Sequence, residues 1–172
     1  DMIPSFAGWF LDYERPILLV AEKDAPDSIA TAVRYLVRMG FDDVRGFLAD
    51  GLHAWETSAR PYGRIPAVPV QELARRIEKG DSFTLLDVRK KDEFESGHLP
   101  NATHVYVGQL PDHLDEIPKD RPVTTFCGSG RRAIIAASIL KQHAFEQVED
   151  CLGSMSACAD YGCPVERSEE GG

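Results

Sequence analysis

Long hydrophobic runs and basic clusters are both missing from this chain of 172 residues. The longest apolar run, residues 16–21, has the length of a strand, whereas a helix that crosses a bilayer needs about 20 apolar residues. No basic segment followed by an apolar one opens the sequence, so we expect neither a membrane span nor a secretory leader. Lysine and arginine number 19 against 28 aspartate and glutamate, and the resulting net charge of -9 repels phosphate backbones. We therefore expect no nucleic-acid partner.

Cysteine is scarce and comes late in the chain. The four cysteines are Cys127, Cys151, Cys158 and Cys163. A secreted disulfide scaffold is shorter and richer in cysteine, and a zinc site usually contains cysteine pairs two residues apart. The sequence has neither feature, so we expect free thiols in a reducing, cytoplasmic setting, with no metal ion and no cofactor.

An internal repeat indicates the architecture. Residues 14–21 align with residues 120–127 without a gap, and residues 40–44 align with residues 144–148. In each copy an acidic-Arg-Pro turn leads into a short β-prone run, a helical pattern and a second strand. The helical pattern of the first copy follows Asp27, the expected N-cap. Two such repeats predict α/β units with parallel strands.

The second copy carries an additional segment, residues 62–119, that has no counterpart in the first. Its predicted elements are a helix at 70–79, a buried strand at 84–88, a short acidic helix at 92–96 and a strand at 103–107. Residues 62–172 are therefore predicted to form one complete domain, and residues 1–61 the back half of a second one. The segment that joins them contains Pro and Gly, as expected of a linker.

The most informative motif is Phe-Cys-Gly-Ser-Gly-Arg-Arg-Ala at residues 126–133. A strand ends at Cys127, a glycine-containing loop turns tightly, and a helix follows. Gly128 and Gly130 allow successive N–H groups to point at one spot, and the helix start adds unpaired N–H groups and the positive end of its dipole. These groups and the two following arginines favour thiolate over thiol. We therefore expect Cys127 to be a nucleophile that is largely ionised at neutral pH.

The alternative for Cys127 is a small buried residue at a strand end. The repeat bears on this alternative, because Ala21 occupies the matching position of the first copy. The scaffold is therefore predicted to form without a cysteine there, and the first copy is predicted to lack the chemistry.

These motifs resemble the rhodanese family of sulfurtransferases. The matching segments, in the family's order and spacing, are residues 85–89, Glu93-Phe94, residues 97–102 and the loop at 127–132. The resemblance covers about residues 65–165 and implies a parallel five-stranded α/β sheet flanked by helices. Residues 1–61 resemble the second half of a degenerate rhodanese domain that lacks the cysteine. Tandem modules of this kind follow metallo-β-lactamase-like hydrolase domains in other proteins.

The resemblance also implies an activity. Cys127 would take a sulfane sulfur from thiosulfate or a persulfide donor, and would pass it from a persulfide to cyanide or a cellular thiol. The expected partners are therefore a small sulfur-containing anion and a thiol acceptor. Loop N–H groups of Gly128, Ser129, Gly130, Arg131 and Arg132 would stabilise the anionic sulfur, in the manner of an oxyanion hole.

Several side chains around the loop have expected roles. We expect Arg132 to anchor the loop and attract the anionic donor, and Arg131 to be the more exposed of the two arginines. Solvated charges are the alternative for both. Ser129 is either a hydrogen-bond donor to the bound sulfur or a turn former.

Three residues of the extra segment support the loop at a distance. Asp87 and Arg89 are expected to form an ion pair that positions the strand end near the loop. His98 follows Gly97 in a turn, and we expect it to satisfy backbone groups, with a general-base role as the alternative.

The later cysteines are predicted to be structural. Cys151 and Cys158 align with Phe47 and Trp55, which are apolar packing positions. The alternative is a resolving cysteine that forms a disulfide with Cys127 or accepts its sulfur, and Cys158 is the favoured candidate.

Two rival functions remain. Cysteine phosphatases of the same fold place five residues between cysteine and arginine, whereas four separate Cys127 from Arg132, a shorter loop that suits one sulfur atom better than a phosphate. The other rival is a regulatory or docking module of a larger hydrolase. Residues 1–61 would leave sheet edges and apolar faces uncovered, so we also expect either a homo-oligomer or pairing with an upstream domain.

Overall fold

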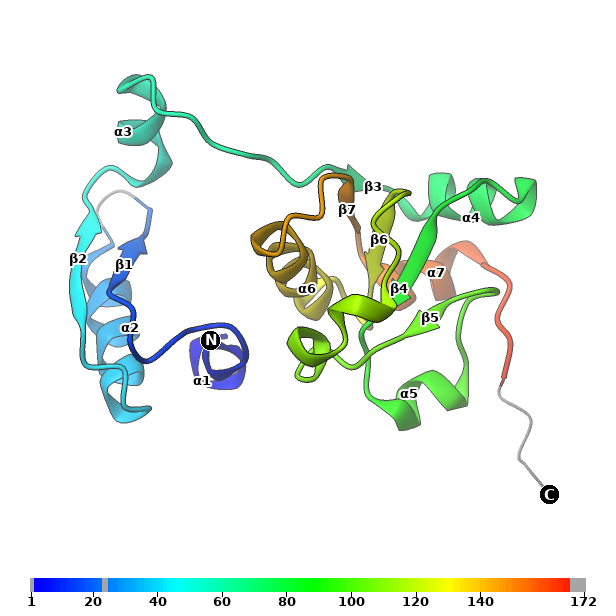
Figure 1. Ribbon diagram of the computed structural model, residues 1–172, viewed down its shortest axis with the longest axis horizontal. Helices are drawn as coiled ribbons and strands as arrows, with labels where there is room; N and C mark the ends of the chain where they lie inside the picture. Colours follow the sequence, from blue (N-terminus) through cyan, green and yellow to red (C-terminus); the bar gives the residue numbers. More distant parts are fainter. Residues whose placement is uncertain (1, 23–24, 168–172) are drawn as a thin grey trace. The chain divides into compact units, whose positions relative to one another are not determined.

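The computed structural model describes residues 2–22 and 25–167. The chain divides into two compact units, Asp1–Gly63 and Arg64–Gly172, each of which is described by itself (Figure 1). Within the described residues, no helix is long and apolar enough to cross a lipid bilayer.

The second unit contains a five-stranded parallel sheet, and this confirms the predicted α/β class. The strands are β3 (Ala67–Val68), β4 (Thr84–Asp87), β5 (Thr103–His104), β6 (Val123–Phe126) and β7 (Val148–Cys151). Their order across the sheet is β3-β7-β6-β4-β5, and every neighbouring pair is parallel. The central strands β4 and β6 are buried at every residue, as expected where helices cover both faces.

Helices lie on both sides of this sheet, and Figure 1 shows α6 and α4 on opposite sides. The α-helices are α4 (Val70–Lys79), α5 (Lys91–Ser96), α6 (Arg131–Gln142) and α7 (Ser154–Tyr161), and the 3₁₀ helices are η2 (Leu110–Asp112) and η3 (Leu114–Glu116). The predicted bounds of α4 are confirmed, and Gly80 ends the helix in the left-handed conformation at φ 67°. Helix α6 follows the loop directly, as predicted, and begins at Arg131 because Gly130 forms the N-cap at φ 90°.

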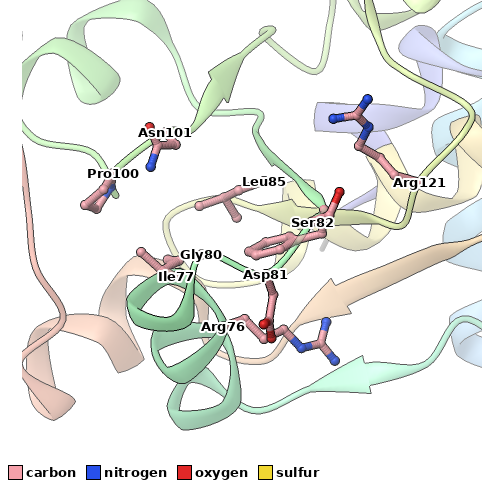
Figure 2. A pocket seen from close by; sticks show the side chains of 10 residues that line it. Arg76, Ile77, Gly80, Asp81, Ser82, Leu85, Pro100, Asn101 and Arg121 are labelled. Atoms are coloured by element: carbon pink, nitrogen blue, oxygen red, sulfur yellow. The ribbon is translucent and has the colours of Figure 1, made fainter.

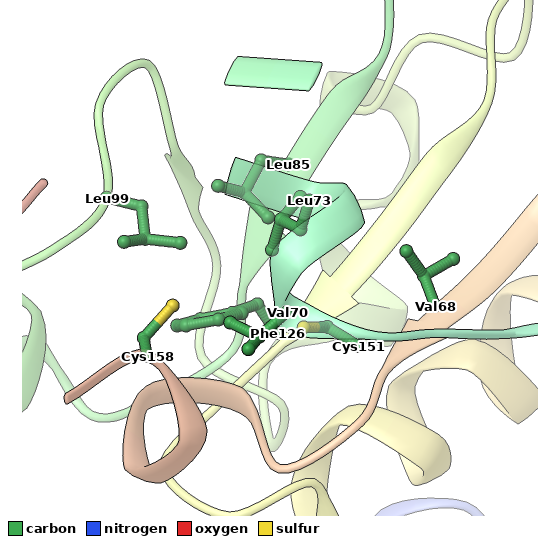
Figure 3. Close-up of a cluster of buried hydrophobic side chains, with 8 residues drawn as sticks. All are labelled: Val68, Val70, Leu73, Leu85, Leu99, Phe126, Cys151 and Cys158. Atoms are coloured by element: carbon green, nitrogen blue, oxygen red, sulfur yellow. The ribbon is translucent and has the colours of Figure 1, made fainter. Parts of the chain in front are cut away.

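The core of the second unit fixes the strand end that carries Cys127. One buried cluster consists of Val68, Val70, Leu73, Leu85, Leu99, Phe126, Cys151 and Cys158. Figure 3 shows the Phe126 ring in the middle of this cluster, with Cys158 of α7 beside it. On α6, Ala133, Ala136 and Ala137 are fully buried. Because Phe126 is enclosed, the residue after it has a defined position.

The first unit is smaller. Its elements are α1 (Ile3–Phe6), the 3₁₀ helix η1 (Ala7–Trp9), β1 (Ile17–Val20), α2 (Pro26–Arg38), β2 (Val44–Leu48) and α3 (Gly51–Thr57). Strands β1 and β2 form a two-stranded parallel sheet. The buried residues Leu36 and Phe41 pack with Ile17 and Val44. The prediction that Asp27 is the N-cap is wrong: α2 begins at Pro26, whose ring presets the φ of a first helical residue.

One face of the β1–β2 sheet is open. Alternate residues along both strands are exposed, among them Leu18 at 72%, Val20 at 57% and Phe47 at 53%. In the second unit, Phe126 and Cys151 align with Val20 and Phe47 and are buried beneath α4 and α7. The open face therefore consists of the positions that helices cover in the second unit.

Candidate active site

Cys127 lies at the carboxyl end of β6, where parallel sheets commonly carry their active sites. Its side chain is buried, at 1% exposure, and its Sγ accepts a hydrogen bond from the Gly130 N–H at 3.1 Å. On the neighbouring strand, the Val88 N–H donates to the Phe126 carbonyl at 2.9 Å. The strand end is thereby fixed from one side, and the loop closes over the sulfur from the other.

The amino end of α7 forms the floor of the loop. The Cys127 N–H donates to the Ser154 hydroxyl at 3.1 Å, and this hydroxyl donates to the Cys151 carbonyl at 3.1 Å. The Met155 N–H donates to the Cys127 carbonyl at 3.0 Å. The N–H and hydroxyl of Ser156 both donate to the Gly128 carbonyl at 2.9 Å. Three residue pairs, Cys127–Ser154, Cys127–Met155 and Gly128–Ser156, therefore hold the loop to α7.

The start of α6 supplies positive potential beside the sulfur. The first N–H groups of an α-helix have no partner within the helix, and they carry the positive end of its dipole. Gly130 takes its left-handed conformation directly before this turn, which directs its own N–H at Cys127. The loop and the helix start can therefore stabilise a negatively charged sulfur.

Arg132 crosses the loop to reach α5. Its guanidinium binds both carboxylate oxygens of Glu93, at 2.6 and 2.7 Å. These hydrogen bonds are the main reason why the pKa of Glu93 is lowered to about 2. A Cβ atom at Gly128 would lie 3.2 Å from the Arg132 guanidinium, so this position leaves little room for a side chain. Arg131, by contrast, is exposed.

Glu93 was absent from the predicted site residues. The sequence offered one signal for it, the Glu93-Phe94 pair among the family motifs, but nothing in local periodicity links it to a loop 39 residues away.

The strand end of β4 carries a buried ion pair. Asp87 is fully buried and Arg89 is 5% exposed, and the Arg89 Nη2 lies 2.6 Å from an Asp87 carboxylate oxygen. The same Nη2 donates to the Gly97 carbonyl at 2.7 Å. The pair therefore ties the end of β4 to the turn after α5.

His98 is occupied by backbone groups. Its Nδ1 lies 3.0 Å from the Phe94 carbonyl, its ring stacks on Phe94 at 4.0 Å, and its backbone pairs with Glu166 through two hydrogen bonds of 2.8 Å. The structure thus brings Cys127, Gly128, Gly130 and Arg132 together, leaves Ser129 and Arg131 at the exposed rim, and places His98 in a turn.

The remaining cysteines differ from each other. Cys151 is a free, fully buried thiol, and burial raises its pKa to about 12. Cys158 and Cys163 form a disulfide, so the prediction of free thiols is wrong for these two residues. The left-handed Gly162 ends α7 at φ 85° and turns the chain so that the two sulfurs meet across the helix end.

A separate pocket of about 340 Å³ lies near the amino ends of β4 and β6, the edge opposite the loop. Its arginines are already paired: Arg76 with Glu72 and Glu149, and Arg121 with Asp120. Figure 2 shows Pro100 and Asn101 on one side of Leu85 and Arg121 on the other. Among the described residues, no three His, Cys, Asp or Glu side chains form a group that could hold a metal ion.

Comparisons with known proteins agree with the fold of the second unit. The sequence model of the Rhodanese-like domain matches residues 69–160. A sulfurtransferase of Allochromatium vinosum is 31% identical over 101 residues, which are 59% of this chain and 94% of that protein. The Bacillus subtilis protein YrkF is 28% identical over 112 residues, and the match spans 65% of this chain and 59% of YrkF. The crystal structure of a rhodanese-like domain protein from Staphylococcus aureus has the same fold, with a TM-score of 0.55 and 23% identity, over 61% of this chain and 100% of that one.

Proposed function

The chain belongs to the rhodanese-like family, and we propose that it is a sulfurtransferase in which Cys127 carries the transferred sulfur as a persulfide. The observation that carries this proposal is the Gly130 N–H that donates to Cys127 Sγ at 3.1 Å, at the start of α6. An N–H donor and a helix dipole both favour the anionic form of the sulfur, which is the nucleophile.

The reaction has two steps. The Cys127 thiolate attacks the outer sulfur of thiosulfate, the sulfur–sulfur bond of the donor breaks, and sulfite leaves with the electron pair. A thiol or cyanide acceptor then attacks the terminal sulfur of the persulfide, and the Cys127 thiolate leaves. Negative charge lies on sulfur at the start and end of each step, so the loop N–H groups stabilise it throughout.

The neighbouring residues have separate roles in this proposal. Arg132, fixed by Glu93, sets the shape of the loop and adds a positive charge beside it. Arg131 is exposed beside the loop and attracts the anionic donor. Asp87, Arg89 and His98 position the surrounding turns and touch no reacting atom.

Intact mass spectrometry after thiosulfate treatment tests the proposal. The chain is reduced, freed of reductant and incubated with thiosulfate, and we expect it to gain the mass of one sulfur atom and to lose it again on addition of cyanide. Cys127→Ala should abolish the gain, whereas Cys151→Ala, which removes the other free buried thiol, should keep it. A gain that survives Cys127→Ala would contradict the proposal. Turnover of an aryl phosphate without sulfur loading would favour the phosphatase alternative.

We also propose that Asp1–Gly63 is the back half of a Cys-less rhodanese-like domain. Elements β1–α2–β2–α3 follow the order of β6–α6–β7–α7. The hydrogen bond from Ile17 N–H to Asp43 O, 2.8 Å, has a counterpart from Val123 N–H to Gln147 O, 2.9 Å. We expect the Ile17 and Val123 amides to have protection factors of the same order of magnitude in hydrogen exchange. An unprotected Ile17 amide would count against the proposal.

In this arrangement the first unit serves as a regulatory or docking piece, since Ala21 stands where the nucleophile would be. A larger protein with a metallo-β-lactamase-like hydrolase domain is the context that the resemblance suggests. Sulfur loading that depends on Cys127 would show that the second unit has an activity of its own in addition to any such role.

A further inference from the structure

We propose that Cys158 and Cys163 form a thiol–disulfide exchange site that controls access to the Cys127 sulfur. With the disulfide closed, the loop is held over the sulfur, and reduction by a small cellular thiol releases it. The inference rests on the proposed function only for its consequence, sulfur transfer, because access to the sulfur can be measured by itself.

The first observation is that α7 both carries Cys158 and holds the loop. The Met155 and Ser156 N–H groups, in the first turn of α7, donate to the carbonyls of Cys127 and Gly128 at 3.0 and 2.9 Å. Cys158 is one turn further along the same helix and lies in the core beside Phe126. A constraint on the end of α7 therefore acts on the helix that forms the floor of the loop.

The second observation is that the disulfide connects α7 to a segment that grips the opposite side of the site. After Gly162 the chain runs back, and Glu166 pairs with His98 through two backbone hydrogen bonds of 2.8 Å. Val165 packs closely on Gly97, because a Cβ atom added at Gly97 would lie 2.9 Å from a methyl carbon of Val165. Residues 163–166 thereby fix the turn at which α5 ends.

The third observation is that α5 connects the 163–166 segment back to the loop. Helix α5 carries Glu93, which binds the Arg132 guanidinium at 2.6 and 2.7 Å, and Arg132 lies in the first turn of α6, directly after the loop. The contacts thus run from the loop through α7, the disulfide and the 163–166 segment to α5, and through Glu93 back to the loop. In this closed state Cys127 is 1% exposed, although a donor must reach its sulfur.

The two sulfurs differ in accessibility, and this sets the direction of exchange. Cys158 is 1% exposed, whereas Cys163 is only partly buried. An external thiolate therefore attacks Cys163 Sγ, the protein disulfide breaks, and the electron pair leaves on Cys158 Sγ, which takes up a proton. A second external thiolate then attacks the external sulfur of this mixed disulfide, the bond to Cys163 Sγ breaks, and Cys163 leaves as a thiolate that takes up a proton. In total, one protein disulfide and two thiols give two protein thiols and one external disulfide.

The alkylation rate of Cys127 by iodoacetamide, followed by peptide mass spectrometry, tests the gate. We expect Cys127 to react about tenfold faster in the reduced chain than in the disulfide-bonded chain, since opening of the loop becomes more frequent. The double variant Cys158→Ala/Cys163→Ala should react at the faster rate whether or not reductant is present. Cys151→Ala is the matched control and should keep the full response to reductant. Equal rates in the two redox states of the wild-type chain would overturn the proposal.

Hydrogen exchange of the wild-type chain provides a second measurement that needs no variant. On reduction, the amides of Met155, Ser156 and Glu166 should all exchange faster, because each donates a hydrogen bond to another of the segments that these contacts connect. Faster exchange confined to residues 158–163 would overturn the proposal. If the alkylation rate changes but thiosulfate loads neither redox state, the gate stands and the sulfurtransferase function fails.

Discussion

The Arg132 guanidinium binds both carboxylate oxygens of Glu93, at 2.6 and 2.7 Å, across 39 residues of sequence. An arginine in the first turn of a helix is unfavourably placed against the helix dipole. The negative charge of Glu93 compensates for this placement, and its two hydrogen bonds fix the direction of the Arg132 side chain. The arginine can therefore remain beside the loop, where its charge favours an anionic sulfur.

Replacement of Glu93 tests this relationship. We expect Glu93→Gln to slow sulfur loading of Cys127 and to lower the free energy of unfolding by about 1–2 kcal/mol, because a partly buried, doubly bonded charge pair is lost. Initial loading rates and urea denaturation measure the two effects. Glu95→Gln is the matched control on the same helix. Its exposed pair with Lys91, at 3.6 Å, should contribute less than about 0.5 kcal/mol. Equal behaviour of the two variants would contradict the assigned role of Glu93.

Asp87→Asn is expected to cause a larger loss of stability. Asp87 is fully buried and neutralises Arg89, so the variant leaves a buried guanidinium without its counter-charge, at a cost of about 3–5 kcal/mol. Urea denaturation measures this cost. Asp120→Asn removes the same charge from an exposed pair with Arg121, and should lower the stability far less than Asp87→Asn does. A cost for Asp87→Asn no greater than that of Asp120→Asn would show that the buried pair is dispensable.

Local patterns in the sequence were sufficient to predict much of the second unit. The apolar pattern of residues 70–79 predicts helix α4, and a β-prone run predicts β6. The loop was predicted from a cysteine followed by two glycines, because these residue types restrict the backbone conformations available to it.

Contacts between distant segments were not predictable in the same way. The Arg132–Glu93 pair, the Ser154 hydroxyl under Cys127 and the Cys158–Cys163 disulfide all depend on how separate elements or turns meet. The N-cap of α2 was mispredicted for a different reason. Asp27 and Pro26 both signal a helix start, and the fixed φ of proline determined the position.

The hydroxyl of Ser154 gives a third prediction. Ser154 is fully buried, and Ser154→Ala leaves the Cys127 N–H without its acceptor, so we expect a loss of about 1–3 kcal/mol and slower sulfur loading. Urea denaturation and the exchange rate of the Cys127 amide measure the effect. Ser138→Ala removes an exposed hydroxyl that donates within α6, and should change the stability by less than about 0.5 kcal/mol. An unchanged Cys127 exchange rate in Ser154→Ala would contradict the role of this hydroxyl.

Asp150 gives a pH-dependent prediction. Burial raises the pKa of its carboxyl to about 6, although the Thr125 hydroxyl, 3.4 Å away, partly opposes the shift. The folded chain therefore holds this proton more tightly than the unfolded chain does. The stabilisation that results is complete below the unfolded pKa, near 4, and is lost as the pH rises through about 6. At higher pH a charged carboxylate remains buried within β7.

Asp150→Asn removes that charge and keeps an oxygen for the Thr125 hydroxyl. We expect its stability relative to the wild-type chain to increase by about 2–3 kcal/mol between about pH 4 and about pH 8. Urea denaturation at a series of pH values measures the difference, and pH effects at all other groups cancel between the two proteins. Asp120→Asn is the control of opposite sign, because Arg121 lowers the pKa of that exposed carboxyl. A difference for Asp150→Asn that stays constant, or that falls as the pH rises, would show that Asp150 is ionised in the folded chain without penalty.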